Sequence, residues 1–228
     1  KKIHTDGKIW SATNEFFARC PAPIVGVTGT KGKGTTASLI ASIFEASGRT
    51  TWLVGNIGTA SLETLHLIKP DDIVVYELSS FQLWDLERSP QAAVVLLIEP
   101  DHLNVHDDMS DYVAAKANIR RFQTESDICV YHPTNAYSKQ ISQANDKGRV
   151  ERYAIADDGG VYVKDGSFCQ NDQLICPVDS LQLIGQHNIE NACAAISIAK
   201  AYDVANASIE VGLQKFQGLP HRIEYVRT

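Results

Sequence analysis

Residues 23–44 read PIVGVTGTKGKGTTASLIASIF and combine three patterns in a row. The apolar, β-branched run from Pro23 to Thr28 predicts a buried strand. A glycine-rich loop follows, and apolar residues at helical spacing from Gly34 to Ser47 predict a helix that stops at Gly48. A strand, a glycine-rich loop and a helix in this order typically open a parallel α/β sheet. Such a loop binds anions, because backbone N–H groups and the positive end of the helix point at it.

The loop offers the groups that a nucleotide phosphate needs. Lys33 is expected to reach the β- and γ-phosphates, and Thr35 or Thr36 to offer a hydroxyl to Mg²⁺. The general GxxxxGK[ST] pattern is matched imperfectly, because Val27 replaces its first glycine and Gly34 stands where Ser or Thr is expected. A glycine-rich turn without a ligand is the alternative, and the position between a strand and a helix favours a phosphate site.

Strand and helix patterns alternate through the rest of the chain. Further strands are predicted at 50–54, 72–78, 92–98 and 128–131, and helices at 110–122, 188–202 and 208–216. Short β-like runs at 152–154, 161–163 and 173–176, with turn signals at 159–160 and 165–166, predict a small antiparallel excursion. We therefore expect an α/β fold with a P-loop-type, mostly parallel sheet, helices on both faces and this antiparallel addition.

The composition narrows the class of protein. With 228 residues and 44% hydrophobic content, the chain can form one large domain with a substantial core. A net charge of −6 without a basic run argues against a nucleic-acid partner. No apolar run reaches the roughly 18 residues of a membrane span, and polar residues interrupt the first twenty-five positions, so a cytoplasmic protein is expected. The five cysteines show no CxxC spacing and are expected to be reduced thiols.

Polar residues follow two of the predicted strands. Glu77 ends the third strand and His102 follows the fourth, and ligands of an open parallel sheet bind beyond the carboxyl ends of its strands. A carboxylate there suits a hard cation such as Mg²⁺, and the alternative at each position is a solvated polar side chain. His106 is expected at the surface. Lys116 lies in a predicted helix, where a lysine is ordinarily a solvated charge.

A further candidate motif opens the helix predicted at 188–202. Its sequence is GQHNIEN, residues 185–191, in which Asn188 and Asn191 are three residues apart and share a helix face. Their amides both donate and accept hydrogen bonds, which suits the edge of an adenine base. The alternative is that Asn188 only caps the helix.

In their order along the chain, these motifs resemble those of the Mur ligases, ATP-dependent amide ligases of peptidoglycan synthesis. The resemblance extends from about Pro23 to Glu224 and implies a central ATP-binding domain with ATP and two Mg²⁺ ions as cofactors. The motifs that carry it are GTKGK (29–33), GNIG (55–58), ELSSFQL (77–83), DH (101–102), YVAAK (112–116), GQHNIEN (185–191) and GLPHRIE (218–224).

The resemblance implies a role for each matched residue. Lys33, His102 and Lys116 would be catalytic, and Lys116 would be carbamylated by CO₂, which turns a cation into a metal-binding anion. A carbamate forms only on a neutral amine, which a nearby cation favours. The implied metal ligands are Thr35, Glu77, His102 and Lys116. The implied nucleotide contacts are Gly29, Thr30, Lys31, Gly32, Lys33, Gly34, Thr35, Thr36, Asn188, Asn191 and Arg222, with His221 as a weaker candidate, and the implied substrate contacts are Asn56, Ser79 and Gln82.

Two of the motifs favour one branch of the family. ELSSFQL and PHR are similar to the forms found in members that add D-glutamate, so the resemblance implies D-glutamate and the nucleotide sugar UDP-N-acetylmuramoyl-L-alanine as substrates. The alternatives are another Mur-type or folylpolyglutamate-type ligase, a generic P-loop NTPase, and a non-catalytic nucleotide-binding module that acts as a scaffold or sensor.

The domain boundaries follow from the same resemblance. Residues 1–22 are expected to be the tail of a preceding region, 23–217 the central ATP-binding domain, and 218–228 the start of a linker to a C-terminal domain. Complete members carry substrate-binding domains on both sides. We therefore expect a monomeric fragment that lacks ligase activity by itself.

Overall fold

A six-stranded sheet forms the centre of the computed structural model, which describes residues 10–56, 58–156 and 159–218. Its strand order is β2-β3-β1-β4-β5-β6, and all of these neighbours pair in parallel. Strand β1 therefore lies inside the sheet, between β3 and β4. The strands are β1 (Ile24–Thr28), β2 (Thr51–Gly55), β3 (Ile73–Glu77), β4 (Ala92–Val95), β5 (Ile128–Tyr131) and β6 (Arg149–Arg152).

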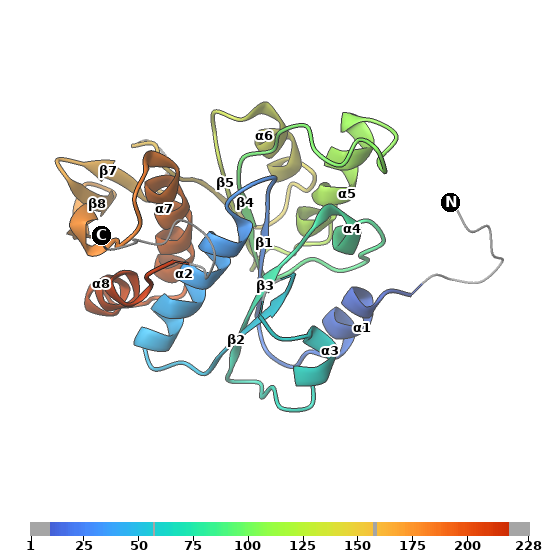
Figure 1. The fold of residues 1–228 in the computed structure, drawn as a ribbon, viewed down its shortest axis with the longest axis horizontal. Coiled ribbons are helices and arrows are strands. Elements are labelled where there is room, and N and C mark those ends of the chain that lie inside the picture. The colour runs from blue at the N-terminus through green and yellow to red at the C-terminus, as the bar shows by residue number, and fades with distance from the viewer. Residues whose placement is uncertain (1–9, 57, 157–158, 219–228) are drawn as a thin grey trace, which may run out of the picture.

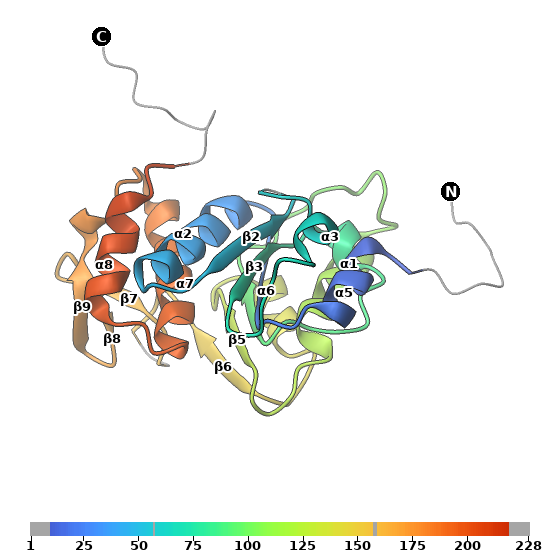
Figure 2. The ribbon, with the colours of Figure 1, turned by 90° about the horizontal axis from the view of Figure 1, so that it is seen from below.

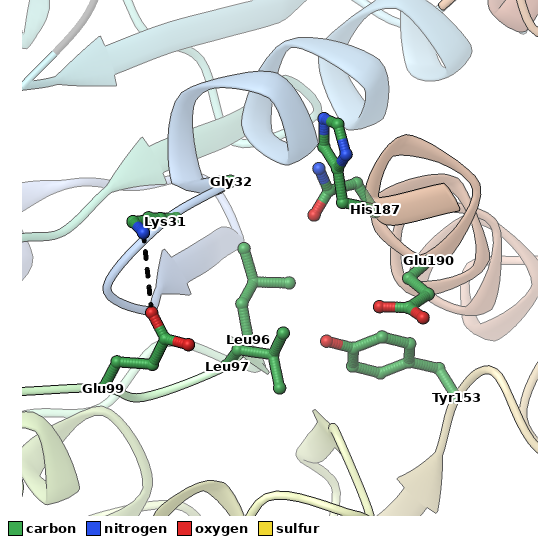
Figure 3. Close-up of a pocket in the computed structure, with 9 residues that line it drawn as sticks. Lys31, Gly32, Leu96, Leu97, Glu99, Tyr153, His187 and Glu190 are labelled. Carbon is green, nitrogen blue, oxygen red and sulfur yellow. Dashed lines mark ion pairs between the residues drawn. The ribbon is translucent and has the colours of Figure 1, made fainter. Parts of the chain in front are cut away.

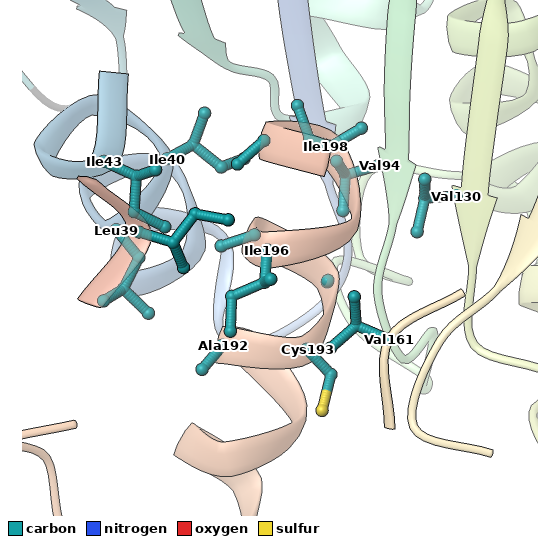
Figure 4. Close-up of a cluster of buried hydrophobic side chains, with 14 of the residues drawn as sticks. Leu39, Ile40, Ile43, Val94, Val130, Val161, Ala192, Cys193, Ile196 and Ile198 are labelled. Atoms are coloured by element: carbon teal, nitrogen blue, oxygen red, sulfur yellow. The ribbon is translucent and has the colours of Figure 1, made fainter. Parts of the chain in front are cut away.

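Helices cover both faces of the sheet, as predicted (Figure 1). Because successive side chains of a strand point to opposite faces, Val25 and Val27 join a core under α2, α7 and α8, whereas Ile24 joins a second core under α1, α5 and α6. Figure 4 shows the first core, where α2 and α7 meet Val94 and Val130 of the sheet. The helices are α1 (Ala12–Arg19), α2 (Lys33–Ala46), α3 (Ser61–Thr64), α4 (Ser80–Leu83), α5 (Met109–Arg121), α6 (Ala136–Ser142), α7 (Gln186–Ala201) and α8 (Asn206–Lys215), with a 3₁₀ turn at Val178–Ser180.

The predicted antiparallel addition is a three-stranded sheet of β7 (Tyr162–Lys164), β8 (Ser167–Gln170) and β9 (Gln173–Pro177). Its hairpins turn at Asp165-Gly166 and at Asn171-Asp172, and all four residues have positive φ, as in type I′ turns. The small sheet lies beside α8 (Figure 2). It adds Phe168 and other side chains to the first core, so it is part of the same folded unit.

Some predicted boundaries are wrong. The run 152–154 was expected in the antiparallel addition, but β6 pairs with β5 at the edge of the parallel sheet. Two of the four residues of its sequence RVER are exposed and three are charged, so it lacks the apolar pattern of an inner strand. Strand β8 was missed because Asn171-Asp172 lacks the glycine that usually marks such a turn. The fourth strand ends at Val95 and not at residue 98.

The short helices were also missed. The helices α1, α3, α4 and α6 have only four to eight residues, too few to show a clear helical period. Helix α1 packs on the sheet through Phe16, whose ring meets that of Tyr76 edge-on at 5.3 Å. All five cysteines are free in this structure. Within the described residues, no helix is long and apolar enough to cross a membrane.

Candidate functional site

The glycine-rich loop lies at the carboxyl end of β1, held by the chain segments that follow β3 and β4. The Thr30 N–H donates to the Leu97 carbonyl at 2.9 Å, and the Thr30 hydroxyl accepts from the Glu99 N–H at 2.9 Å. On the other side, the Thr28 hydroxyl donates to the Leu78 carbonyl at 2.9 Å. The loop is therefore fixed between its two neighbours before any ligand binds.

Helix α2 starts directly from this loop. Gly32 is its N-cap residue, with φ 83°, and no side chain of the described residues caps the helix there. The first N–H groups of a helix lack acceptors within the helix, and they carry its partial positive charge. The Lys33 Nζ turns back over the loop and donates to the Thr30 carbonyl at 3.1 Å. This arrangement suits an anion such as a nucleotide phosphate.

Lys116 lies beneath the loop and not at the surface. It is 1% exposed, and its Nζ donates to the Thr28 hydroxyl at 3.2 Å and to the Gly29 carbonyl at 3.1 Å. Burial, assisted by the positive charge of Lys33, lowers the pKa of Lys116 to about 7. A large share of this amine is therefore neutral near pH 7. The alternative of a solvated helix lysine is wrong, because α5 packs this face against β1.

Glu77 is buried beside the same loop. It lies opposite Val27 in the pairing of β3 with β1 and is 3% exposed, and its Oε2 has no hydrogen-bond partner among the described residues. A buried carboxylate oxygen in this state is costly, and a bound cation would satisfy it. The hydroxyl of Thr36 is likewise buried without a partner in the described chain, whereas Thr35 is partly exposed.

The two histidines after β4 differ from each other in their burial. The His102 side chain is 48% exposed, with its Nε2 3.5 Å from an oxygen of Asp101. The His106 side chain is fully buried, because the rings of Phe81 and Trp84 stack on it at 5.5 and 4.4 Å. The prediction that His106 is a surface residue is wrong. Among the described residues, no group of three or more His, Cys, Asp or Glu side chains could hold a metal ion.

A pocket of about 190 Å³ lies between the loop and α7 (Figure 3). Apolar side chains of Leu96 and Leu97 form one wall, and the polar groups of Tyr153 and Glu190 lie opposite. Few polar groups around an apolar wall suit a flat organic ligand such as a nucleotide base. The lining residues are Lys31, Gly32, Leu96, Leu97, Glu99, Tyr153, His187, Glu190 and Asn191.

The two asparagines of the GQHNIEN motif lie beside this pocket. The Asn191 Nδ2 donates to the Asn188 Oδ1 at 3.3 Å, so the two side chains share a helix face, as predicted. The N-cap residue of α7 is Gly185, and the Asn188 side chain instead donates to the Ile184 carbonyl at 2.8 Å. The alternative that Asn188 only caps the helix is therefore wrong.

Sequence reasoning missed three polar residues of the pocket region. The His132 Nε2 is 3.6 Å from an oxygen of Glu190, and the His132 ring meets that of Tyr153 edge-on at 5.1 Å. Burial lowers the pKa of His132, and the charge of Glu190 opposes this shift. Glu190 lies between the two asparagines of the motif, so the motif itself could have indicated that Glu190 belongs to the pocket region. Tyr153 directly follows β6. The sequence pattern places this segment in the antiparallel addition, so it gives no indication that Tyr153 lies at the pocket.

Comparison with known families settles what kind of domain this is. Residues 27–199, most of the chain, match the model of the Mur ligase middle domain. The chain belongs to the Mur ligase family.

Named relatives within the Mur ligase family are similar over nearly the whole chain. The chain is 38% identical to a UDP-N-acetylmuramoylalanine--D-glutamate ligase of Clostridium kluyveri over 221 residues, covering 96% of this chain and 48% of that protein. The corresponding enzyme of Streptococcus thermophilus is 33% identical, with 96% and 49% covered. The chain thus spans about half the length of the curated relatives it matches.

Solved structures confirm the Mur ligase fold. UDP-N-acetylmuramoylalanyl-D-glutamyl-2,6-diaminopimelate--D-alanyl-D-alanyl ligase from Acinetobacter baumannii superimposes with a TM-score of 0.73 at 19% identity, covering 95% of this chain and 51% of that one. An FPGS from L. casei gives a TM-score of 0.69 at 15% identity, covering 98% and 72%. At these identities the likeness concerns the fold alone.

The remaining residues expected to contact a Mur ligase substrate lie close to Glu77. Asn56 is hydrogen-bonded to it, and Ser79 and Gln82 follow it in the sequence. Asn56 is exposed after β2, and its N–H donates to the Glu77 carbonyl at 3.3 Å. Ser79 and Gln82 form a capping box that starts α4, since each side chain bonds the backbone N–H of the other. Their contacts with a substrate stay predictions. Arg222 and His221 lie outside the described residues.

Proposed function

We propose that this chain is the ATP-binding domain of a Mur ligase that joins D-glutamate to UDP-N-acetylmuramoyl-L-alanine. The Clostridium and Streptococcus relatives carry D-glutamate ligase activity in their names. The observation that carries the proposal is Lys116, a buried amine with a pKa of about 7 that is bonded to the phosphate loop. Simple phosphate binding needs no second lysine under the loop, whereas a ligase that carbamylates this lysine needs a neutral amine there.

The nucleotide site of the proposal has two parts. The loop of residues 29–36 and Lys33 would hold the phosphates, and the pocket beside Asn188 and Asn191 would hold the base. Gly32 joins the parts, because it belongs to the loop and also lines the pocket. Phosphoryl transfer depends on positioning and charge neutralisation, which backbone N–H groups and a lysine supply.

The residues present fit a magnesium site. The Glu77 Oε2, which lacks a partner among the described residues, and the hydroxyls of Thr35 and Thr36 are oxygen ligands, which Mg²⁺ prefers. A carbamate on Lys116 would add a further anionic oxygen, and His102 is the nitrogen ligand of the proposal. Mg²⁺ bound there would neutralise charge on the transferred phosphoryl group. We propose two such ions, in keeping with the family resemblance.

The proposed reaction has two steps. The carboxylate of the nucleotide sugar attacks the γ-phosphorus of ATP, which gives an acyl phosphate and releases ADP. The amine of D-glutamate then attacks the acyl carbon, so that an amide forms, phosphate leaves and the amine proton is lost. Relatives are about twice as long as this chain, so the binding of both substrates is proposed for the longer, cytoplasmic ligase.

Two alternatives make different predictions. A folylpolyglutamate-type ligase has the same fold, but the ELSSFQL segment favours the D-glutamate branch, and assays of a complete ligase with a panel of amino acids would decide. A non-catalytic nucleotide-binding module would bind nucleotide without needing a neutral Lys116 or a buried Glu77 oxygen that has no partner among the described residues.

The first experiment is calorimetry with a non-hydrolysable ATP analogue, with and without Mg²⁺, on this chain and on Lys33→Ala. We expect Mg²⁺-dependent binding that the variant loses. Lys215→Ala, at the exposed end of α8, removes the same charge and should bind normally. Binding that is equal in the chain and in Lys33→Ala would contradict the phosphate site.

A second experiment tests Lys116. In ¹³C-bicarbonate buffer with Mg²⁺ and nucleotide, we expect one carbamate carbon signal in the NMR spectrum of the chain. The signal should be absent from Lys116→Met and present in Lys215→Ala. A signal that persists in Lys116→Met would place the carbamate on another amine.

A further inference from the structure

His106 has a hydrogen bond on each ring nitrogen, although no role has been given to it above. Its Nδ1 is 3.0 Å from Oδ2 of Asp111, and its Nε2 is 3.0 Å from Oγ of Ser80. The Asp111 carboxylate only accepts, so Nδ1 carries a proton, and in the neutral ring Nε2 then accepts from the Ser80 hydroxyl. The ring is therefore fixed in one orientation.

The order serine, histidine, aspartate resembles that of a nucleophilic triad, but the surroundings exclude this use. Ser80 is 1% exposed and is the first residue of α4. A substrate carbonyl cannot reach its hydroxyl, and a nucleophile needs such access. The three residues therefore connect parts of the structure, and they do not attack a substrate.

The connected parts are α4, the loop after β4 and the start of α5. The rings of Phe81 and Trp84, both at α4, stack on the His106 ring, and Tyr112 of α5 meets it edge-on at 5.2 Å. The His106 N–H donates to the carbonyl of His102 at 3.0 Å, which closes the loop between the two histidines. His106 is thus a single buried ring that three segments share.

Each of these segments carries part of the proposed site. Tyr112 lies one helical turn before Lys116, whose Nζ is 4.7 Å from the centre of the Tyr112 ring, and the Tyr112 hydroxyl is 3.3 Å from that of Thr30. On the other side, Ser80 follows Ser79 directly in the segment that starts at Glu77. His106 and its partners link the Glu77 side to the Lys116 side across this edge. They do so beside two other links, the bonds of Thr28 to Lys116 and Leu78 and the bonds of the Asn118 amide to the Leu83 and Trp84 carbonyls.

We propose that His106, held by Ser80 and Asp111, is a positioning residue. It sets the distance between the segment that carries Glu77 and the segment that carries Lys116, at the edge of the sheet where Mg²⁺ is proposed to bind. The inference rests on the proposed function, because it presumes that Mg²⁺ binds between them. The inference makes different predictions for metal-free nucleotide binding and for the affinity gained from Mg²⁺. Nucleotide binding without metal depends on the loop and the base pocket and does not need His106, whereas the gain in affinity from Mg²⁺ does.

The test is calorimetry of this chain with the ATP analogue, with and without Mg²⁺, on His106→Phe. Phenylalanine keeps an aromatic ring for the stack but loses both hydrogen bonds. We expect metal-free affinity within about twofold of the wild type, and a loss of roughly tenfold in the Mg²⁺-dependent gain, as is typical when a group behind a metal ligand is removed. His66→Phe, at an exposed position, should change neither value.

Variants of the partners keep the test decisive if His106→Phe does not fold. Ser80→Ala and Asp111→Ala should each reduce the Mg²⁺-dependent gain, and Asp111→Asn should restore most of it, because its amide oxygen still accepts from Nδ1. An unchanged gain in all variants would overturn the proposal. The proposal would also be overturned if the affinities with and without Mg²⁺ fell equally and in proportion to the loss of melting temperature, because that result indicates a purely structural role. If the wild type itself gains no affinity from Mg²⁺, the proposed function fails first, which is a distinct result.

Discussion

Gly32 and Asn191 approach so closely that a β-carbon at position 32 would lie 2.6 Å from Oδ1 of Asn191. Asn191 in turn bonds Asn188 and lines the pocket. The phosphate loop and α7 therefore behave as one packed unit, and a change at the loop is transmitted to the proposed base site.

Gly32→Ala is expected to lower stability and nucleotide affinity together. The left-handed backbone at φ 83° disfavours alanine by about 1 kcal/mol or more, and the contact with Asn191 adds a steric cost of about 1 kcal/mol or more. Gly48→Ala is the matched control, because φ is 85° there and nothing lies within 4 Å of the new β-carbon. Urea unfolding and calorimetry would measure both effects. Equal losses of stability in the two variants would mean that the Asn191 contact has no energetic weight.

Lys116 should make stability depend on pH in a defined direction. Its pKa falls from the ordinary 10.5 to about 7 on folding, so the unfolded chain binds the extra proton between these values. Stability should therefore rise with pH from about 7 to 10.5, by roughly 1 kcal/mol per pH unit from this group. Lys116→Met should lack this contribution. The comparison needs urea unfolding in buffers free of metal and CO₂, and parallel curves for the two proteins would refute it.

Gly212→Ala should destabilise the packing of α8 on α2. Alanine ordinarily stabilises a helix interior by about 0.5–1 kcal/mol over glycine, but here its β-carbon would lie 2.5 Å from Cα of Ile43. Overpacking of this kind costs about 1–3 kcal/mol. Val211→Ala, next to it and more exposed, should change stability by less than about 0.5 kcal/mol. A more stable Gly212→Ala protein would show that the two helices can move apart at little cost.

Lys31→Ala should separate binding from stability. The Lys31–Glu99 pair is 3.6 Å long, and Lys31 is 86% exposed, so removing it should change stability by less than about 0.5 kcal/mol. Its charge lies beside the pocket, so affinity for the ATP analogue should fall, more at low salt than at high salt. Calorimetry at two salt concentrations measures this. Unchanged affinity at low salt would remove Lys31 from the proposed nucleotide contacts.

The central sheet was predictable because its inner strands are buried on both faces. Runs such as 72–78 must be almost continuously apolar when helices cover both sides, and the glycine loop marks the start of α2. The edge strand β6 has no such requirement, because two of its four residues are exposed. Its sheet membership depends on pairing with β5, which the local sequence does not encode.

The burial of the site residues could not be predicted from local sequence. Lys116 is buried because α5 packs it against Thr28 and Gly29, which are distant in the sequence. His106 lies in a polar loop, and it is covered by Phe81 and Trp84 at a helix of only four residues. In both cases tertiary packing sets the environment of the side chain. The sequence therefore shows which residue stands at each position, but not whether its side chain is buried.

The parallel pairing of β1 has a consequence for how the chain folds. Val25 pairs with Val75 on one side and with Ala92 on the other, so β1 finds its partners only after both later strands have been synthesised. Parallel pairs of this kind form slowly, because each needs a crossover to close first. During translation the apolar β1 segment stays unpaired for that time, and unpaired apolar strands are prone to aggregate. We expect nucleotide binding to appear last during refolding, as the sign that the sheet around β1 has closed.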